Sequence, residues 1–226
     1  MRCNRGIKMV NKLIDHTLLK AFATEGDIIK LCNEAKEYHF KSVCVNPVNV
    51  SLAAKLLKDS DVLVCTVIGF PLGANTIAIK EAETTDAINN GAREIDMVIN
   101  VGKAKEHDFA YIEKEIAAVV KAAKGNTVKV IIETCYLDDF EKAEVCKAAT
   151  LAKANFVKTS TGFGTGGANC HDVAIMKANI APNMEVKASG GIKTYEDVKA
   201  LVASGATRIG ASAGIAIMEA AEKENK

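Results

Sequence analysis

Asn-Phe-Val-Lys-Thr-Ser-Thr-Gly-Phe-Gly-Thr-Gly-Gly, residues 155–167, joins a strand-like segment to a glycine-rich loop. Phe156, Val157 and their β-branched neighbours predict a buried strand, yet Lys158 lies inside it, where an ammonium group is costly to desolvate. Most lysines keep their charge in water, so Lys158 alone is equally well explained as a strand end with its amine in solvent. The loop of Ser160, Thr161 and four glycines predicts backbone N–H groups that can approach a phosphate.

The rest of the chain repeats the same alternation of strand and helix. Strands are predicted at 13–17, 42–46, 62–70, 94–101, 128–134, 156–160, 185–189 and 207–210, and helices at 24–40, 48–58, 76–90, 109–123, 138–153, 171–179, 194–204 and from 212. Strict alternation implies a parallel sheet, and a count of eight favours the α/β class and a closed (β/α)₈ TIM barrel. No linker divides the chain, so we expect one barrel domain over residues 13–226 after a flexible lead-in at 1–12.

The main rival fold is an open dinucleotide-binding sheet. Gly162, Gly164 and Gly167 satisfy the Gly-x-Gly-x-x-Gly pattern after a strand. That pattern requires an acidic residue about twenty positions later, at the end of the next strand. The sequence has Lys187 and its neighbours there, so the nucleotide interpretation is disfavoured.

Composition excludes several classes of function. With 29 basic and 28 acidic residues, the formal net charge of +1 offers no electrostatic footprint for nucleic acid or an anionic membrane. No stretch predicts a signal peptide or a membrane span, so a cytoplasmic protein is expected. Neither the four histidines nor the cysteines show metal-ligand spacing, and we expect no metal and no cofactor. The cysteines, seven in number, are expected to be reduced thiols: 3, 32, 44, 65, 135, 146 and 170.

Three ionisable residues interrupt predicted strands. Asp96, Lys158 and Lys187 each lie in an otherwise strand-like run. Function in such barrels sits at the carboxyl ends of the strands, so one shared polar site explains them better than three unrelated rim charges. A lysine that forms a Schiff base must be neutral to attack a carbonyl, and a second ammonium nearby favours that neutral form. A carboxylate can then shuttle the protons.

Phosphate-binding features lie on the last loops of the predicted barrel. The seventh strand ends in Ser-Gly-Gly, and the eighth leads through Gly-Ala-Ser to a helix N-terminus, where barrels habitually bind phosphate. The alternative is that these glycines only make tight turns. The candidate substrate-binding and phosphate-binding residues are Thr17, Thr161, Gly162, Gly190, Gly191, Gly210 and Ser212.

Several motifs together resemble one enzyme family. Asp-His-Thr-Leu-Leu (15–19), Val-Cys-Val-Asn-Pro (43–47), Val-Ile-Gly-Phe-Pro-Leu-Gly (67–73), Glu-Ile-Asp-Met-Val-Ile-Asn (94–100), Phe-Val-Lys-Thr-Ser-Thr-Gly-Phe (156–163) and Val-Lys-Ala-Ser-Gly-Gly-Ile (186–192) are similar to the 2-deoxyribose-5-phosphate aldolases. The resemblance spans roughly residues 13 to 218. It implies a metal-free class I aldolase that reversibly joins acetaldehyde to glyceraldehyde 3-phosphate. It also implies roles for Lys158 as Schiff-base lysine, Lys187 as the second lysine that perturbs it, and Asp96 as proton-relay acid.

One departure from the family pattern concerns the C-terminus. Many members end in a tyrosine that reaches back to the site, whereas the last tyrosine here is Tyr195 and the tail reads Glu-Lys-Glu-Asn-Lys. Two alternatives stay open at this stage: a different Schiff-base phosphosugar enzyme, such as a transaldolase-like barrel, and a non-catalytic sugar-phosphate-binding barrel. Cys44 and Tyr136 are expected to be packing or structural residues. A homodimer is expected because symmetric self-association is common for such barrels.

Overall fold

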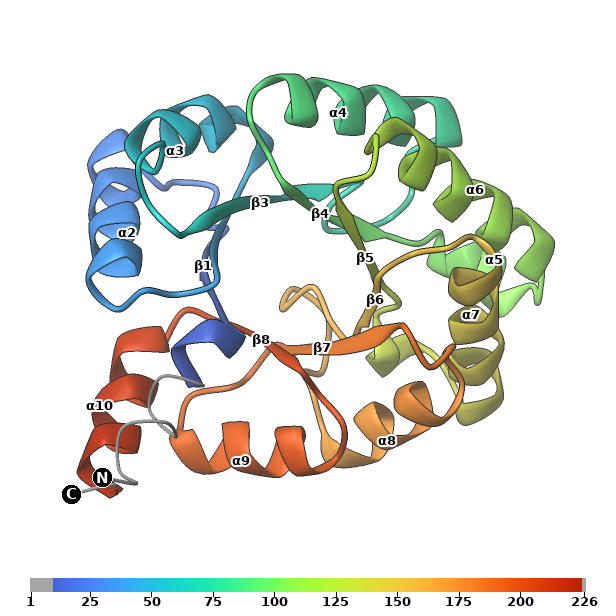
Figure 1. The fold of residues 1–226 in the computed structure, drawn as a ribbon. Coiled ribbons are helices and arrows are strands. Elements are labelled where there is room, and N and C mark those ends of the chain that lie inside the picture. Colours follow the sequence, from blue (N-terminus) through green and yellow to red (C-terminus); the bar gives the residue numbers. More distant parts are fainter. Residues whose placement is uncertain (1–9, 225–226) are drawn as a thin grey trace.

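The eight strands form one closed parallel barrel in the order β1 to β8, and helices surround it (Figure 1). The computed structural model describes residues 10–224. The predicted (β/α)₈ barrel is therefore confirmed, and the open dinucleotide-binding sheet is excluded. The strands are β1 (Ile14–Leu18), β2 (Ser42–Val45), β3 (Leu63–Ile68), β4 (Glu94–Val98), β5 (Thr127–Ile131), β6 (Phe156–Lys158), β7 (Glu185–Ser189) and β8 (Arg208–Ala211).

Nine α-helices connect and cover the strands in the described part of the chain. Their caps follow the sequence signals: Thr24 with Asp27, and Thr194 with Asp197, both form the capping boxes that their spacing predicts. The helices are α2 (Glu25–Glu37), α3 (Val50–Leu56), α4 (Ile77–Asn89), α5 (Val101–Lys105), α6 (Phe109–Ala122), α7 (Asp139–Leu151), α8 (Cys170–Ala178), α9 (Tyr195–Ala203) and α10 (Gly214–Glu224). Short 3₁₀ turns occur at Asn11–Leu13, Pro47–Asn49 and Thr134–Tyr136.

The expected lead-in lies mostly outside the described residues, and the fourth strand differs in detail from the prediction. Residues 1–9 of the lead-in lie outside the described residues, whereas Asn11 is buried and its side-chain amide donates to Tyr38 O at 2.9 Å. The prediction that the fourth strand reaches residue 101 is wrong, because β4 ends at Val98 and the short helix α5 follows. Asn100 causes the change, since its side-chain oxygen accepts the Lys103 N–H at 3.0 Å and caps α5.

Strand register decides which side chains meet inside the barrel. Residues in register on neighbouring parallel strands point to the same side of the sheet. Asp96 is in register with Lys129, and Lys158 with Lys187, and all four side chains are buried. The barrel interior therefore carries charged side chains, while the large apolar core lies between strands and helices.

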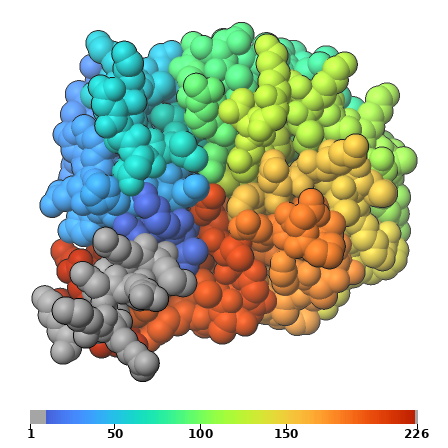
Figure 2. Space-filling model, viewed as in Figure 1, coloured from blue at the N-terminus to red at the C-terminus, as the bar shows by residue number. Residues whose placement is uncertain are grey.

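The ring closes where the first strand meets the last. β1 pairs with β8 in parallel, and Figure 2 shows the blue and red sectors of the surface side by side. Within residues 10–224, none of the helices combines the length and apolar character that crossing a membrane requires.

Candidate active site

One carboxylate lies at the centre of the polar interior. Asp96 Oδ2 accepts a hydrogen bond from Lys158 Nζ at 2.7 Å and another from Lys187 Nζ at 2.7 Å. Lys158 is 3% exposed, and Asp96 and Lys187 are fully buried. The three ionisable residues singled out in the sequence thus converge on a single oxygen atom.

A deeper layer of charged residues supports this centre, and the sequence analysis missed it. Lys129 Nζ donates to Asp96 Oδ1 at 2.8 Å and lies 2.7 Å from a Glu94 carboxylate oxygen. Arg208 Nη1 donates to Asp15 Oδ1 at 2.8 Å and to Glu94 Oε2 at 3.0 Å. The interior therefore holds a connected network of three carboxylates and four cations, which we call the barrel network: Asp15, Glu94, Asp96, Lys129, Lys158, Lys187 and Arg208.

The barrel network keeps Asp96 and Lys187 charged in spite of burial. Burial by itself raises the pKa of Asp96, but Lys129, Lys158 and Lys187 outweigh it and hold that pKa well below its usual range. Burial lowers the pKa of Lys187, but Asp15 and Asp96 reverse this, so the pKa is raised overall. Lys187 is therefore a permanent cation beside Lys158.

A cavity of about 270 Å³ opens above the barrel network at the carboxyl ends of the strands. Lys158 reaches its floor, with Asp96 and Lys187 beneath. Gly210 leaves room for this arrangement, because a Cβ atom there would lie 3.1 Å from Lys187 Cε. Eight of the ten predicted site residues line the cavity: Thr17, Lys158, Thr161, Gly162, Gly190, Gly191, Gly210 and Ser212.

Two further lysines line the same cavity. Lys20 follows β1, and Lys193 follows the Gly190–Gly191 turn after β7. Both lie on loops where a surface lysine is common, so neither carries a signal that sequence reasoning could have used. With the glycine N–H groups beside them, they make this end of the cavity suited to an anion.

The chain matches a known aldolase family over most of its length. The model of the DeoC/LacD family aldolases matches residues 9–220. This chain belongs to the DeoC/LacD aldolase family. It is 60% identical over 209 residues to a deoxyribose-phosphate aldolase of Clostridium perfringens strain SM101, covering 92% of this chain and 93% of that protein. It is 58% identical over 213 residues to one of Streptococcus sanguinis, covering 94% and 97%.

A solved structure is also similar to this chain. The deoxyribose phosphate aldolase of Aeropyrum pernix, described as a tetramer, superimposes with a TM-score of 0.88 at 33% identity. The match covers 96% of this chain and 95% of that one. The similarity therefore extends over nearly the whole barrel.

Glu133 is another residue of the site that the sequence did not single out. It follows β5 with a left-handed backbone, φ 53°, which is uncommon for a residue other than glycine. Its carboxylate accepts the Thr161 backbone N–H at 3.1 Å and also the Thr161 hydroxyl. Glu133 thus fixes the loop that follows Lys158.

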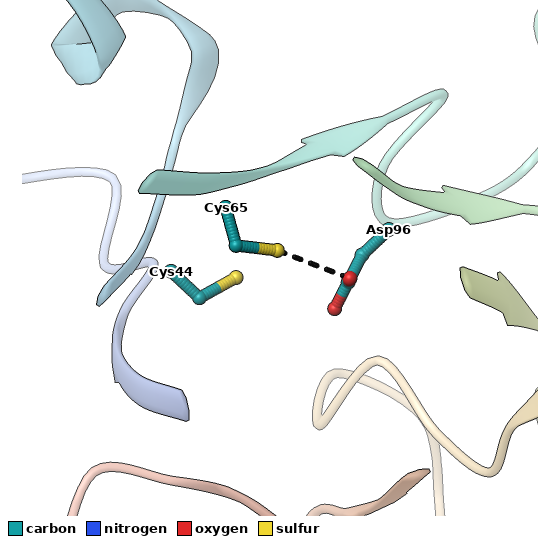
Figure 3. A group of neighbouring side chains, drawn as sticks. All are labelled: Cys44, Cys65 and Asp96. Atoms are coloured by element: carbon teal, nitrogen blue, oxygen red, sulfur yellow. Dashed lines mark hydrogen bonds between the residues drawn. The ribbon is translucent and has the colours of Figure 1, made fainter. Parts of the chain in front are cut away.

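A small thiol-rich, apolar cluster lies inside the barrel on β2 and β3. Cys44, Cys65 and Val67 are buried together, and Leu19 and Phe70 pack against them. Figure 3 shows the Cys65 thiol directed at Asp96, with Sγ 3.1 Å from Oδ1. The cavity itself combines its cationic, glycine-lined end with the apolar side chains of Leu18, Leu19 and Ile192.

Proposed function

We propose that this chain is a deoxyribose-phosphate aldolase that reversibly cleaves 2-deoxy-D-ribose 5-phosphate to D-glyceraldehyde 3-phosphate and acetaldehyde through a Schiff base on Lys158. One observation carries the proposal: a single buried oxygen of Asp96 accepts hydrogen bonds from both Lys158 and Lys187. The names of the relatives in the DeoC/LacD family support the substrate.

In this proposal Lys158 attacks the aldehyde carbonyl of the substrate. The neighbouring Lys187 ammonium disfavours a second positive charge close to it. The amine adds to C1, and loss of water from the carbinolamine leaves an iminium ion. Asp96 is the group placed to accept and return the protons of these steps.

The iminium then accepts the electrons of the bond that breaks. As the C3 hydroxyl loses its proton, the C2–C3 bond cleaves and its electron pair forms the enamine on Lys158. Glyceraldehyde 3-phosphate leaves with the new carbonyl at C3. Protonation of the enamine carbon and addition of water release acetaldehyde and restore the amine. No change of oxidation state is required of the protein.

The phosphate end of the substrate fits the glycine-lined end of the cavity. Gly162, Gly190 and Gly191 all have positive φ, a backbone conformation that brings N–H groups close to a ligand. Ser212 lies just before α10, at the positive end of that helix. Thr17 and Thr161 line the cavity with Lys158 and supply hydroxyl groups for the sugar.

Borohydride trapping tests the Schiff base. Incubation with acetaldehyde or deoxyribose 5-phosphate plus borohydride should modify one lysine irreversibly, and peptide mapping should place the adduct on Lys158. Product analysis with acetaldehyde as donor separates this enzyme from a transaldolase-like barrel. Inactivation without a lysine adduct, or full activity in Lys158→Ala in the presence of EDTA, would overturn the proposal in favour of a binding protein.

A pair of glycines tests the phosphate site. A Cβ atom at Gly191, φ +77°, meets nothing within 4 Å, and the same holds at Gly125, φ +85°, in the loop before β5. Gly191→Leu and Gly125→Leu therefore carry comparable backbone strain. Only Gly191→Leu should raise KM, by about tenfold for deoxyribose 5-phosphate and little for free deoxyribose. Equal effects on both substrates would contradict phosphate binding there.

The homodimer and the cytoplasmic location stay predictions.

A further inference from the structure

We infer that Cys44, Cys65 and Asp96 form a binding site for Zn²⁺, and that the bound ion inhibits the enzyme. The two Sγ atoms and a carboxylate oxygen of Asp96 all lie within 4.8 Å of one another, and all three residues are buried. Figure 3 shows the three side chains turned toward one another inside the barrel. Two thiols with a carboxylate are a ligand set that suits Zn²⁺.

The strand register creates this cluster. Cys44 and Cys65 are in register on β2 and β3, so both thiols enter the barrel at the same height. Cys65 is in register with Glu94, which places Asp96 one pleat closer to the cavity on β4. Around a tetrahedral zinc ion, two sulfur ligands are about 3.8 Å apart, given Zn–S bonds of about 2.3 Å. Small side-chain rotations bring the cluster to that geometry.

The charge balance allows a cation here in spite of the surrounding lysines. The barrel network has one more cation than carboxylates, so an added dication would be repelled. Zinc binds thiolates, however, and binding releases one proton from each cysteine. The exchange of two protons for one Zn²⁺ leaves the net charge of the interior unchanged. Burial and the neighbouring Cys44 and Asp96 raise the pKa of the Cys65 thiol, and Lys129 Nζ, 3.3 Å from Cys65 Sγ, partly opposes this rise.

Inhibition follows from where the ion would bind. Asp96 Oδ1 accepts hydrogen bonds from Lys129 and Cys65, and zinc ligation would replace them. Lys158 Nζ donates to the other oxygen, Oδ2. With zinc on Oδ1, Asp96 would be a weaker base toward Lys158. This inhibition depends on the proposed function, but binding of the ion does not.

Direct binding measurements test the site without an activity assay. Metal-free full-length protein, with Cys3→Ser and Cys170→Ser to remove two other thiols, should bind one Zn²⁺ and release two protons. Co²⁺ in place of Zn²⁺ should give a thiolate-to-metal absorption band with the intensity expected for two thiolate ligands. In the aldolase assay, Zn²⁺ should inhibit and EDTA should restore the rate.

Matched substitutions locate the ligands. Cys44→Ala and Cys65→Ala should each weaken Zn²⁺ binding by at least about 100-fold, because each removes a ligand. Cys146→Ala is the control, since Cys146 is a buried thiol in α7 whose pKa burial raises to about 12. That variant should bind Zn²⁺ as the parent does.

Each failure has a distinct meaning. Zinc affinity unchanged in Cys44→Ala and Cys65→Ala, or Co²⁺ binding without a thiolate band, would overturn the site. If the cysteine variants fail to fold, the Co²⁺ spectrum of the parent protein still decides. Zinc binding with the expected ligands in a protein that cleaves no deoxyribose 5-phosphate would retain the site and overturn the proposed function.

Discussion

Two fully buried lysines differ in the number of carboxylates around them. Lys80, on α4, lies outside the barrel interior, where it donates to Gly73 O at 2.8 Å and Val98 O at 2.7 Å and pairs with Glu115 at 2.5 Å. Lys187, inside the barrel, lies 2.5 Å from an Asp15 oxygen and 2.7 Å from Asp96 Oδ2.

The pKa of the buried lysine is lowered at one site and raised at the other. Burial lowers the pKa of Lys80 and raises the pKa of Glu115, although each partly compensates the other. The pKa of Lys187 is raised, because two carboxylates together outweigh its burial. One carboxylate in direct contact, with a weaker contribution from Glu83, does not offset the desolvation of the Lys80 ammonium, whereas two carboxylates in direct contact offset that of Lys187. Of these two sites, the barrel network is the one that holds a fixed cation, which is what Lys158 chemistry requires.

Asp96→Asn should produce the largest effect, because it removes the carboxylate that Lys158 and Lys187 share. Asparagine keeps the size of aspartate but cannot take up a proton. Loss of general acid–base catalysis should lower kcat by about 10³-fold. Lys187 is then paired with one carboxylate, that of Asp15, as Lys80 is paired with that of Glu115. Steady-state cleavage of deoxyribose 5-phosphate measures the change.

A buried ion pair outside the barrel is the control for Asp96. Lys142 donates to Asp172 Oδ1 at 2.7 Å between α7 and α8. Asp172→Asn breaks that pair without touching the cavity, so kcat should stay within about twofold of the parent value. Equal losses of kcat in the two variants would attribute the Asp96 effect to general destabilisation.

Lys80→Met should mainly affect stability. It leaves Glu115 buried without a cation, which costs about 3–5 kcal/mol in the free energy of unfolding. Combining Lys80→Met with Glu115→Gln should recover most of this loss, since the glutamine side chain would still offer an acceptor to the Asn100 N–H, which Glu115 now accepts at 2.9 Å. Urea unfolding of the single and the double variant measures the free energy of unfolding. If Lys80→Met were as stable as the parent, the Lys80–Glu115 pair would contribute nothing to stability.

The pH dependence of that double variant sharpens the comparison. Because the pKa of Glu115 is raised, the folded chain binds this proton more tightly than the unfolded chain. The resulting stability is fully present below the unfolded pKa of about 4.3 and is lost as pH rises through the folded value. The stability advantage of the parent over the double variant should therefore shrink as the pH rises above about 4. A constant difference would contradict the raised pKa.

Site residues could be predicted from the sequence where an ionisable residue interrupts an apolar strand. They could not be predicted where their ion pairs form only on closure of the barrel. Asp96, Lys158 and Lys187 were found because each is an ionisable residue within an apolar run. Lys129 carries the same signal inside β5 and could have been found. Glu94, at the start of its strand, looks like an ordinary strand end, and only barrel closure reveals its partners.

Local backbone conformation was the other limit. Alternating segments and capping pairs predicted the barrel and most helices, because both depend on residues close in sequence. The left-handed Glu133 was not predictable, because its conformation is held by contacts with Thr161 on the next loop. The same holds for the position of Gly210 against Lys187.

Lys187→Leu should give the smallest of these effects and the most direct test of the comparison. Removing the fixed cation takes away the like charge beside the Lys158 amine, so activity at neutral pH should fall by about tenfold and the pH optimum should move upward on the order of one unit. Lys142→Leu removes another buried, carboxylate-paired lysine whose pKa is raised, but outside the barrel, and should leave the optimum in place. Activity against pH for both variants, alongside urea unfolding, separates loss of charge from loss of fold. An unchanged pH profile with normal activity in Lys187→Leu would remove Lys187 from the mechanism and leave the two-carboxylate site with a structural role only.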